Sequence, residues 1–270
     1  MNTCAYLQEQ LSSEDWQKLQ QLGINFDPDI VRSLWLDYVN FEKRRATEVP
    51  FLLQQLSDYA HPPVFDAALG SGATSLGLRL AGIEDIISNE VDDSLIKLAE
   101  HEAQRVGVTL TITSYDWREL SRQYHGYFDA VVCLGNSLTL LHKREDQLRT
   151  LCSFRHILRE GGTLIIDERN YEEHFLKDPF GRLYRFSGNV VYCGNQAIAA
   201  YPIYISDTMV VMEYKRKSDN TKTHLVLYPF KEGELISLLK RAGFGSIASY
   251  GDYKRDFDKK EPEFLTHVCK

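Results

Sequence analysis

The spacing of apolar residues along the chain changes at about residue 60. Before that point the sequence is typical of helix, and apolar side chains between residues 30 and 56 recur every three or four positions. Asp27 followed by Pro28 is typical of a helix start, with the aspartate as N-cap and the proline in the first turn. We therefore expect residues 1–60 to form a helical N-terminal segment.

From residue 63 onward, short apolar and β-branched runs alternate with amphipathic stretches. This pattern predicts strands and helices in turn: strands at residues 63–69, 85–90, 109–114, 128–134 and 162–168, and helices at residues 74–81, 93–106 and 145–158. Strands that are joined by helices form a parallel sheet covered on both faces. The sequence therefore predicts an α/β fold in this part of the chain.

Residues 183–230 do not follow this alternation. Three aromatic-rich runs occur there without a helix between them, at residues 183–193, 209–217 and 223–230. Turn-forming residues separate the runs. The pattern predicts an antiparallel lid that is inserted after the fifth strand.

The last part of the chain is expected to complete the sheet. A helix is predicted at residues 231–242, and strands at residues 246–253 and 264–269 would add an antiparallel edge. Residues 61–182 and 231–270 would then form one α/β domain around the inserted lid.

Composition narrows the class of protein. The 270 residues (31.1 kDa) are 43% hydrophobic and 26% charged, which suits one large domain with an insertion. The formal net charge of −7 disfavours a nucleic-acid partner, because nucleic-acid binders usually carry a positive surface. No apolar run approaches the roughly 20 residues of a membrane span, so no membrane partner is expected either.

The cysteines and the first residues bear on location. The five cysteines have no C-x-x-C spacing, and no cysteine–histidine cluster has the spacing of metal ligands, so no metal site is expected. The N-terminus lacks the basic and apolar regions of a secretory signal. Both features favour a cytoplasmic protein with reduced thiols.

A glycine-rich turn follows the first predicted strand of the α/β part. Gly70 and Gly72 would let the backbone approach a ligand closely. About twenty residues later, Glu90 ends the second predicted strand, where a carboxylate can accept both hydroxyls of a ribose. Ser75 occupies the last position of the dinucleotide pattern G-x-G-x-x-G, so the turn favours a nucleoside without a pyrophosphate.

Polar and aromatic residues follow the next strands, and ligands of open α/β sheets bind at these carboxyl ends. Asp116 could accept from an exocyclic amine, and Trp117 could cover a purine face. Asn136 offers an amide, and the guanidinium of Arg169 matches a carboxylate in bidentate geometry. The structural alternatives are a surface aspartate beside a core tryptophan, an ordinary loop, and a salt bridge from the arginine to a neighbouring glutamate.

Tyrosines are concentrated in the N-terminal segment and in the predicted lid. Their hydroxyls and ring faces suit a cationic group, although most of them are expected to serve packing. They are Tyr38, Tyr184, Tyr192, Tyr201, Tyr204, Tyr214 and Tyr228. The eight histidines show no arrangement typical of a catalytic triad.

Several motifs follow one another in the second half of the chain. They are CLGNS (133–137), DERNY (167–171), VYCG (191–194), LYPF (227–230), GDY (251–253) and the segment 264–268. Together with the glycine-rich turn, they resemble class I S-adenosylmethionine-dependent methyltransferases, and more narrowly the glycine and glycine/sarcosine N-methyltransferase family. The resemblance implies a Rossmann-like α/β fold with a seven-stranded mixed sheet, helices on both faces and an antiparallel β lid after strand 5.

The resemblance also implies a methyl donor, S-adenosyl-L-methionine, and a product, S-adenosyl-L-homocysteine. The donor contacts would be Ala68, Gly70 and Gly72 (methionine part), Glu90 (ribose), Asp116 and Trp117 (adenine), Leu134 (along the donor) and either Arg44 or Arg45 (carboxylate). The substrate contacts would be Asn136 and Arg169, with Tyr38, Tyr192, Tyr214 and Tyr228 closing the site. In this arrangement the arginine holds the substrate carboxylate.

The implied reaction is direct methyl transfer to the neutral amine of glycine or of its N-methylated derivatives, sarcosine and dimethylglycine. It would serve betaine-type osmolyte synthesis or the balance of methyl groups. Two alternatives stay open: another small amino acid or amine as acceptor, and a catalytically silent donor-binding regulator. Leu140 stands where animal relatives carry a histidine, which leaves the acceptor unsettled. The expected partner is a small-molecule substrate. Assembly of the chain into a homo-oligomer is left open.

Overall fold

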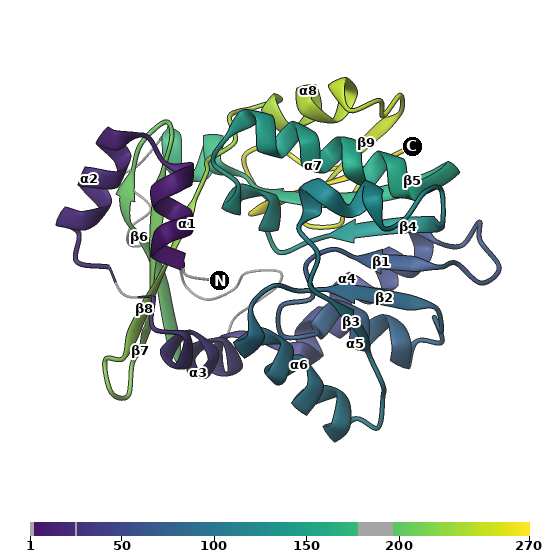
Figure 1. The fold of residues 1–270 in the computed structure, drawn as a ribbon, viewed down its shortest axis with the longest axis horizontal. Coiled ribbons are helices and arrows are strands. Elements are labelled where there is room, and N and C mark those ends of the chain that lie inside the picture. The colour runs from purple at the N-terminus through teal and green to yellow at the C-terminus, as the bar shows by residue number, and fades with distance from the viewer. Residues whose placement is uncertain (1–2, 25, 178–196) are drawn as a thin grey trace.

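The computed structural model describes residues 3–24, 26–177 and 197–270, and the larger of its sheets has seven strands (Figure 1). The strand order is β3-β2-β1-β4-β5-β10-β9. The strands are β1 (Val64–Asp66), β2 (Ile86–Asn89), β3 (Thr111–Thr113), β4 (Phe128–Cys133), β5 (Leu158–Arg169), β9 (Ile247–Gly251) and β10 (Phe264–Cys269). β1 to β5 run parallel, and β10 is antiparallel to β5 and β9. The predicted mixed sheet is confirmed.

Helices cover both faces of this sheet. They are α4 (Phe41–Gln55), α5 (Ala73–Leu80), α6 (Asp93–Arg105), α7 (Arg144–Ile157) and α8 (Glu234–Arg241), with the 3-10 helices η1 (Trp117–Arg122) and η2 (Ser137–Leu140). Neighbouring residues of β4 alternate between two apolar layers, because successive side chains of a strand point to opposite faces. Val131 packs in the layer that contains α7 and α8, whereas Val132 packs in the layer that contains α4 and α5.

The smaller sheet is an antiparallel meander that follows β5 in the chain. Its strands, in the order β6-β7-β8, are β6 (Ile198–Ile205), β7 (Val210–Arg216) and β8 (Lys222–Leu227). The predicted run at residues 209–217 contains β7, the run at residues 223–230 overlaps β8, and the run at residues 183–193 lies outside the described residues. The sequence does not predict β6, because Pro202 has no N–H for a ladder. The strand tolerates this proline because it lies at an edge and its register shifts between Pro202 and Tyr204.

The N-terminal segment is helical but divided into several pieces. Before α4 come α1 (Thr3–Gln10), α2 (Ser13–Gln21) and α3 (Pro28–Tyr38). The predicted helix start is confirmed, because Asp27 accepts a backbone N–H at 2.9 Å and Pro28 begins α3. The periodic run between residues 30 and 56 is two helices, since Asn40 caps α4 by accepting a first-turn N–H at 2.9 Å.

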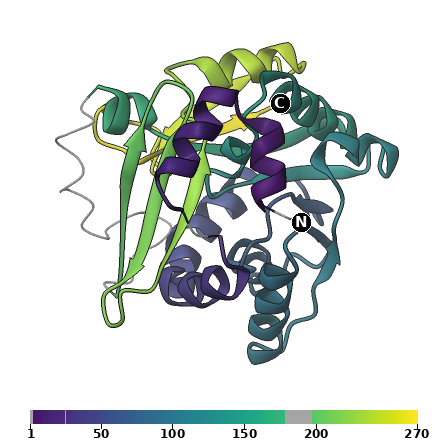
Figure 2. The same cartoon turned by 60° about the vertical axis from the view of Figure 1, so that its left-hand side comes forward.

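The N-terminal helices and the smaller sheet pack together as one unit (Figure 2). On one face of the sheet, Leu7 of α1 and Leu19 of α2 share an apolar layer with Val211 of β7. On the other face, Leu34 of α3 shares a layer with Met212 of the same strand. Segments far apart in the sequence therefore form a two-sided lid beside the larger sheet (Figure 1).

The contact between α4 and α5 predicts the effect of Gly77→Ala. A Cβ on Gly77 would lie 2.5 Å from Cγ2 of Val49, which is a clash inside a packed interface. Alanine is otherwise the better helix former by about 1 kcal/mol, so a loss of stability would come from the clash. We expect the free energy of unfolding to fall by about 1–3 kcal/mol, measured by denaturant titration.

Gly245→Ala is the control, because a Cβ at that position meets no atom within 4 Å. In a Val49→Ala background the clash is absent, and Gly77→Ala should then be neutral or stabilising. Equal stability of the Gly77→Ala and Gly245→Ala proteins would contradict the packing of these helices.

Candidate active site

The glycine-rich turn and Glu90 meet at the carboxyl ends of β1 and β2. Gly70 and Gly72 have φ values of 53° and 89°, a left-handed backbone that glycine adopts without strain. The N–H of Gly70 donates to Oε2 of Glu90 at 3.0 Å. The other oxygen of Glu90 accepts the N–H groups of Val91 and Asp92 at 2.8 and 3.0 Å. Burial raises the pKa of the Glu90 carboxyl. A single hydrogen bond links this carboxylate to the glycine-rich turn.

Ser75 stabilises the glycine-rich turn through hydrogen bonds to the strands next to it. It donates to Asp66 at 2.6 Å and lies 2.8 Å from the hydroxyl of Ser88. Asp66 also accepts the N–H of Ala68 at 3.2 Å, and burial raises the pKa of Asp66 to about 6. The serine that replaces the last glycine of the dinucleotide pattern therefore ties α5 to the end of β1. Sequence reasoning gave no role to this aspartate.

The structure separates the two candidate arginines of α4. Arg44 donates to Glu48 at 2.6 and 2.9 Å and to Oγ1 of Thr74 at 2.9 Å, in the first turn of α5. The side chain of Arg45 is 51% exposed and pairs with Glu42 at 3.0 Å. Only the first of the two lies beside the glycine-rich turn.

Asp116 and Trp117 begin η1 after β3. Arg118 donates to both carboxylate oxygens of Asp116, and these hydrogen bonds lower the pKa of the aspartate. The indole N–H of Trp117 donates to the carbonyl of Ala67 at 2.6 Å, and its ring packs edge-on against Phe154. The tryptophan is therefore half-buried against the end of β1, with its N–H directed inward.

The ends of β4 and β5 are joined by Asp167 and Asn136. Asp167 accepts the N–H groups of Gly135 and Asn136 at 3.1 and 2.7 Å. The amide oxygen of Asn136 accepts the N–H of Arg169 at 2.9 Å, and its amide nitrogen donates to the hydroxyl of Tyr171 at 2.7 Å. Asn136 itself has a left-handed backbone with φ of 64°. Sequence reasoning missed the roles of Asp167 and Tyr171, although both belong to the DERNY motif.

Arg169 is buried among aromatic rings. Its guanidinium carbon lies 4.7 Å from the ring centroid of Phe264 and 5.7 Å from that of Phe175. The side chain is 6% exposed. One structural alternative is a salt bridge between Arg169 and Glu168. In the structure, the carboxylate of Glu168 contacts His267 at 3.1 Å instead.

Two of the predicted tyrosines belong to the same region. Tyr38 of α3 and Tyr214 of β7 are buried, and their ring centroids lie 5.0 Å apart. Trp35 lies 5.5 Å from the first ring and 5.0 Å from the second. Burial alone would lower the pKa of Arg169, but the nearby Tyr214, Tyr38, Glu263 and Tyr171 raise it. The lid and β5 therefore meet at this arginine.

The remaining predicted positions are placed differently. Leu134 is buried at the end of β4, in the layer that contains α4 and α5. The backbone N–H of Tyr228 donates to the carbonyl of Thr139 at 2.7 Å, but its hydroxyl donates to Glu234 at 2.8 Å, at the start of α8. Burial, with that glutamate, raises the pKa of Tyr228 to about 12. Tyr192 lies outside the described residues.

The arrangement suits a nucleoside donor beside a carboxylate-bearing acceptor. A Cβ on Gly70 would meet nothing nearer than the carbonyl oxygen of Ala68 at 4.0 Å, so there is space beside this glycine. Within the described ranges, no three metal-binding side chains are grouped. In the same ranges no helix has the length and apolar character needed to cross a membrane.

Comparisons with known proteins agree with this geometry. Residues 64–162 match the family described as "Methyltransferase domain". The chain is 32% identical over 236 residues to a glycine/sarcosine N-methyltransferase from Aphanothece halophytica, covering 87% of this chain and 86% of that one. It is 32% identical over 235 residues to a glycine/sarcosine/dimethylglycine N-methyltransferase from Actinopolyspora halophila, covering 87% of this chain and 40% of that one. A solved S-adenosylmethionine-dependent methyltransferase from Clostridium acetobutylicum ATCC 824 has a TM-score of 0.62 at 17% identity, covering 86% of this chain and 92% of that one.

The fold and the site define a class I S-adenosylmethionine-dependent methyltransferase. Within that class, the chain belongs to the glycine/sarcosine N-methyltransferase family, because the similarity extends over most of both sequences. The protein is therefore an S-adenosylmethionine-dependent N-methyltransferase, and the resemblance drawn from its motifs is confirmed.

Proposed function

We propose that this enzyme methylates the nitrogen of glycine and of its derivatives sarcosine and dimethylglycine. The observation that carries the proposal is the buried guanidinium of Arg169 between the rings of Phe264 and Phe175. A carboxylate matches such a fork in bidentate geometry. The surrounding rings exclude water, which strengthens the attraction. The printed names of the Aphanothece and Actinopolyspora relatives support the same series of amino acids.

In this proposal the tyrosines around Arg169 receive the amine. Tyr38 and Tyr214 come from the lid, and Tyr171 follows β5. Their oxygens and ring faces would stabilise positive charge on the nitrogen. S-adenosyl-L-methionine supplies an electrophilic methyl group, so the amine lone pair forms the C–N bond while the S–C bond breaks. Glycine and sarcosine then lose a proton to water, and no protein nucleophile is required.

Asn136 is a positioning residue in this proposal. Its amide is engaged by the N–H of Arg169 and by the hydroxyl of Tyr171, at 2.9 and 2.7 Å. It would therefore fix the arginine and the tyrosine relative to each other, so that a bound carboxylate points its nitrogen in one direction.

The proposed donor contacts are centred on the glycine-rich turn. Glu90 would accept the ribose hydroxyls, and Asp116 would accept the adenine amine. Arg44 would hold the donor carboxylate, since it reaches the first turn of α5. Arg45 is not part of this proposal, because it pairs with Glu42 on the surface.

We place the enzyme in the cytoplasm. Among the described residues, Cys133, Cys152 and Cys269 are free thiols. Unpaired cysteines suit a reducing compartment.

Product analysis tests the proposed function. Methyl transfer from S-adenosyl-L-methionine would be followed by mass spectrometry with glycine, sarcosine, dimethylglycine and a panel of other small amines. We expect products from the glycine series, and the heaviest product gives the number of methyl groups added. Transfer only to another amine would overturn the substrate and keep the reaction. Donor binding without transfer to any amine would support the silent regulator instead.

Arg169→Lys should weaken recognition of the substrate carboxylate. Lysine keeps the charge but loses the bidentate fork, which is worth on the order of 2–3 kcal/mol. We expect kcat/KM for glycine to fall at least tenfold, while the KM for the donor stays within about twofold. Arg255→Lys, at an exposed position, is the control. An unchanged kcat/KM for glycine would remove Arg169 from the substrate site.

Arg44→Ala and Arg45→Ala form a matched pair on one helix. Loss of a charged hydrogen bond to the donor carboxylate costs about 1.5–3 kcal/mol, so Arg44→Ala should raise the dissociation constant of S-adenosyl-L-homocysteine about tenfold or more. Arg45→Ala should change it less than twofold, because this side chain is exposed. Calorimetric titration measures both values. A larger effect at position 45 would reverse the assignment.

A further inference from the structure

Helix α1 contacts the smaller sheet and the α/β domain at the same time. On one side, Leu7 is buried in the apolar layer that α1 and α2 share with β7 and β8. On the other side, Gln10 donates to Oδ2 of Asp146 in α7 at 3.0 Å. The hydroxyl of Tyr6 donates to the carbonyl of Leu140 at 3.4 Å. The helix is thus joined to the sheet by apolar packing, and to the α/β domain by these polar contacts and by the ring of Tyr6, which packs against the core of that domain.

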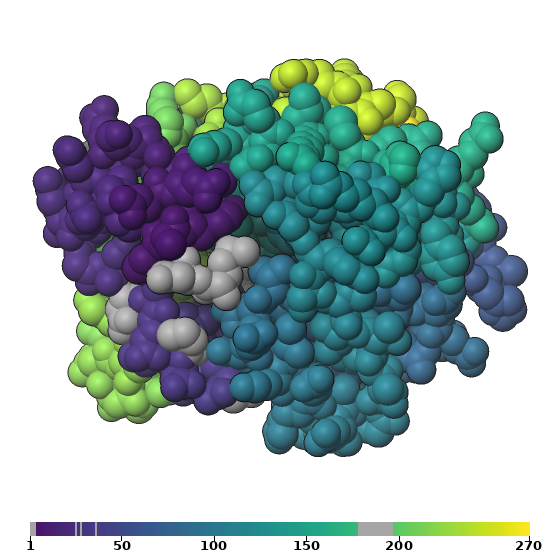
Figure 3. Space-filling model, viewed as in Figure 1, coloured from purple at the N-terminus to yellow at the C-terminus, as the bar shows by residue number. Residues whose placement is uncertain are grey.

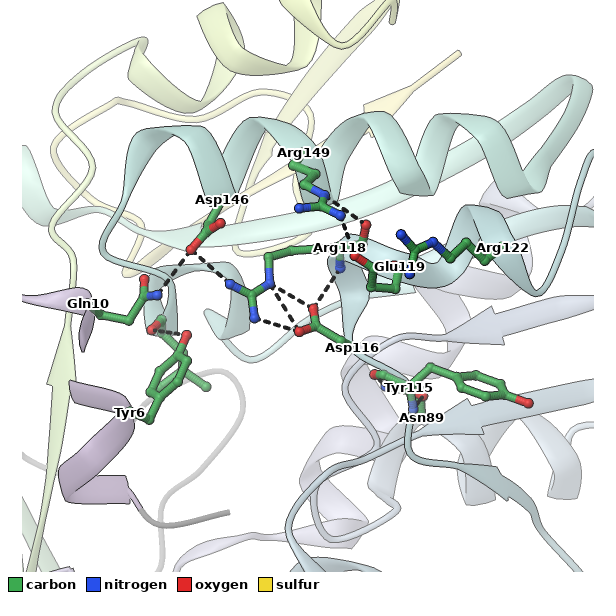
Figure 4. A network of polar contacts seen from close by, with 11 residues as sticks. Tyr6, Gln10, Asn89, Tyr115, Asp116, Arg118, Glu119, Arg122, Asp146 and Arg149 are labelled. Atoms are coloured by element: carbon green, nitrogen blue, oxygen red, sulfur yellow. Dashed lines mark hydrogen bonds and ion pairs between the residues drawn. The ribbon is translucent and has the colours of Figure 1, made fainter. Parts of the chain in front are cut away.

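The polar contacts lead to the residue proposed for the adenine amine (Figure 4). Arg118 donates through Nη1 to the same oxygen of Asp146 at 3.0 Å. Through Nε and Nη2 it also holds both oxygens of Asp116. A continuous chain of contacts therefore runs from Gln10 through Asp146 and Arg118 to Asp116.

Tyr6 lies in the same region. Burial raises the pKa of Tyr6 to about 12, and the nearby charges of Arg118, Asp146 and Asp116 also act on it. The hydroxyl is therefore neutral and can only act as an uncharged donor or acceptor. Figure 3 shows that the surface beside α1 is hollowed, between the N-terminal helices and the teal residues of the α/β domain.

The polar contacts with the α/β domain are the weaker part of the packing of α1. Gln10 is 4% exposed, and its Oε1 is buried without a hydrogen-bond partner among the described residues. A buried acceptor that lacks a partner costs free energy, and 3.4 Å is long for the hydrogen bond of Tyr6. The packing of Leu7 in its apolar layer leaves no polar atom of Leu7 in need of a partner. When the two units separate, α1 should stay with the smaller sheet.

We propose that α1 is a clasp over the adenine end of the donor site, and that Tyr6 and Gln10 set how tightly the donor and its product are held. The inference rests on the donor contacts of the proposed function. An adenine on Asp116 fixes the neighbouring Arg118, which in turn holds Asp146 in place for Gln10. By linkage, a docked α1 favours bound nucleoside to the same extent. Product release then requires that α1 leaves Asp146.

Titration with S-adenosyl-L-homocysteine tests the clasp in the full chain. Removing one hydrogen bond typically changes an equilibrium by about 2- to 10-fold, so Gln10→Ala should raise the dissociation constant about 3- to 10-fold. The change should appear as faster dissociation in stopped-flow measurements. Gln8→Ala is the matched control, because Gln8 is exposed on the same helix. The KM for the amine at saturating donor should not change in either variant.

A double-mutant cycle tests whether α1 controls nucleoside binding or only stabilises the fold. Asp146→Ala should also weaken binding of the nucleoside, and adding Gln10→Ala should have little further effect, because each change alone removes the hydrogen bond between positions 10 and 146. Tyr6→Ala should weaken binding more than Tyr6→Phe, which keeps the ring. Additive effects, or a Gln10→Ala protein that matches Gln8→Ala in affinity and dissociation rate, would overturn the proposal.

The readout does not depend on the acceptor. Because the titration measures product binding, it decides the clasp even if no amine is methylated. A protein that binds S-adenosyl-L-homocysteine with the predicted Gln10 dependence but methylates no amine would keep the clasp and reject the proposed function.

Discussion

The carboxylate of Asp167 is the constraint on which the proposed substrate side of the site depends. It accepts two successive backbone N–H groups after β4, at Gly135 and Asn136. These bonds hold Asn136 in a left-handed backbone, which is uncommon and costly for a residue other than glycine. In that conformation the asparagine amide reaches the backbone of Arg169 and the hydroxyl of Tyr171. The proposed substrate side is therefore held together by the protein's own hydrogen bonds, an arrangement that limits the entropy lost on binding.

The proposed donor side is built on buried carboxylates instead. Glu48 is fully buried in α4, where it accepts from Arg44 and from Thr74. Asp66 ties the end of β1 to Ser75. Each carboxylate connects two elements beneath the glycine-rich turn, so the turn is fixed by hydrogen bonds within the α/β domain.

Local patterns in the sequence predict the larger sheet well. The strands are short apolar runs bounded by turn residues, and the Asp27–Pro28 pair marks a helix start without reference to the rest of the chain. β6 is not predicted in this way, because its Pro202 is tolerated only where the strand lies at the edge of a sheet. That position is a property of the assembled sheet.

The site residues divide in the same way. The proximity of Glu90 and Gly70 can be predicted, because their spacing follows from a strand–turn–helix unit. The choice between Arg44 and Arg45 cannot be made from the sequence, because neighbouring residues on a helix point about 100° apart. Only the packed structure shows which of the two faces α5. Residue type alone also does not reveal that the indole N–H of Trp117 is directed to a backbone carbonyl.

The two-sided lid has a consequence for how the chain acquires its fold during synthesis. Asp15 of α2 bonds Thr208 across 193 residues of sequence, and Ser33 of α3 bonds Arg216 across 183. The N-terminal helices therefore leave the ribosome long before the strands that bury their apolar faces. Contacts of such large separation form slowly, because a long loop must first be closed. Until then the helices expose apolar surface, which makes the nascent N-terminus the natural place for a chaperone to act.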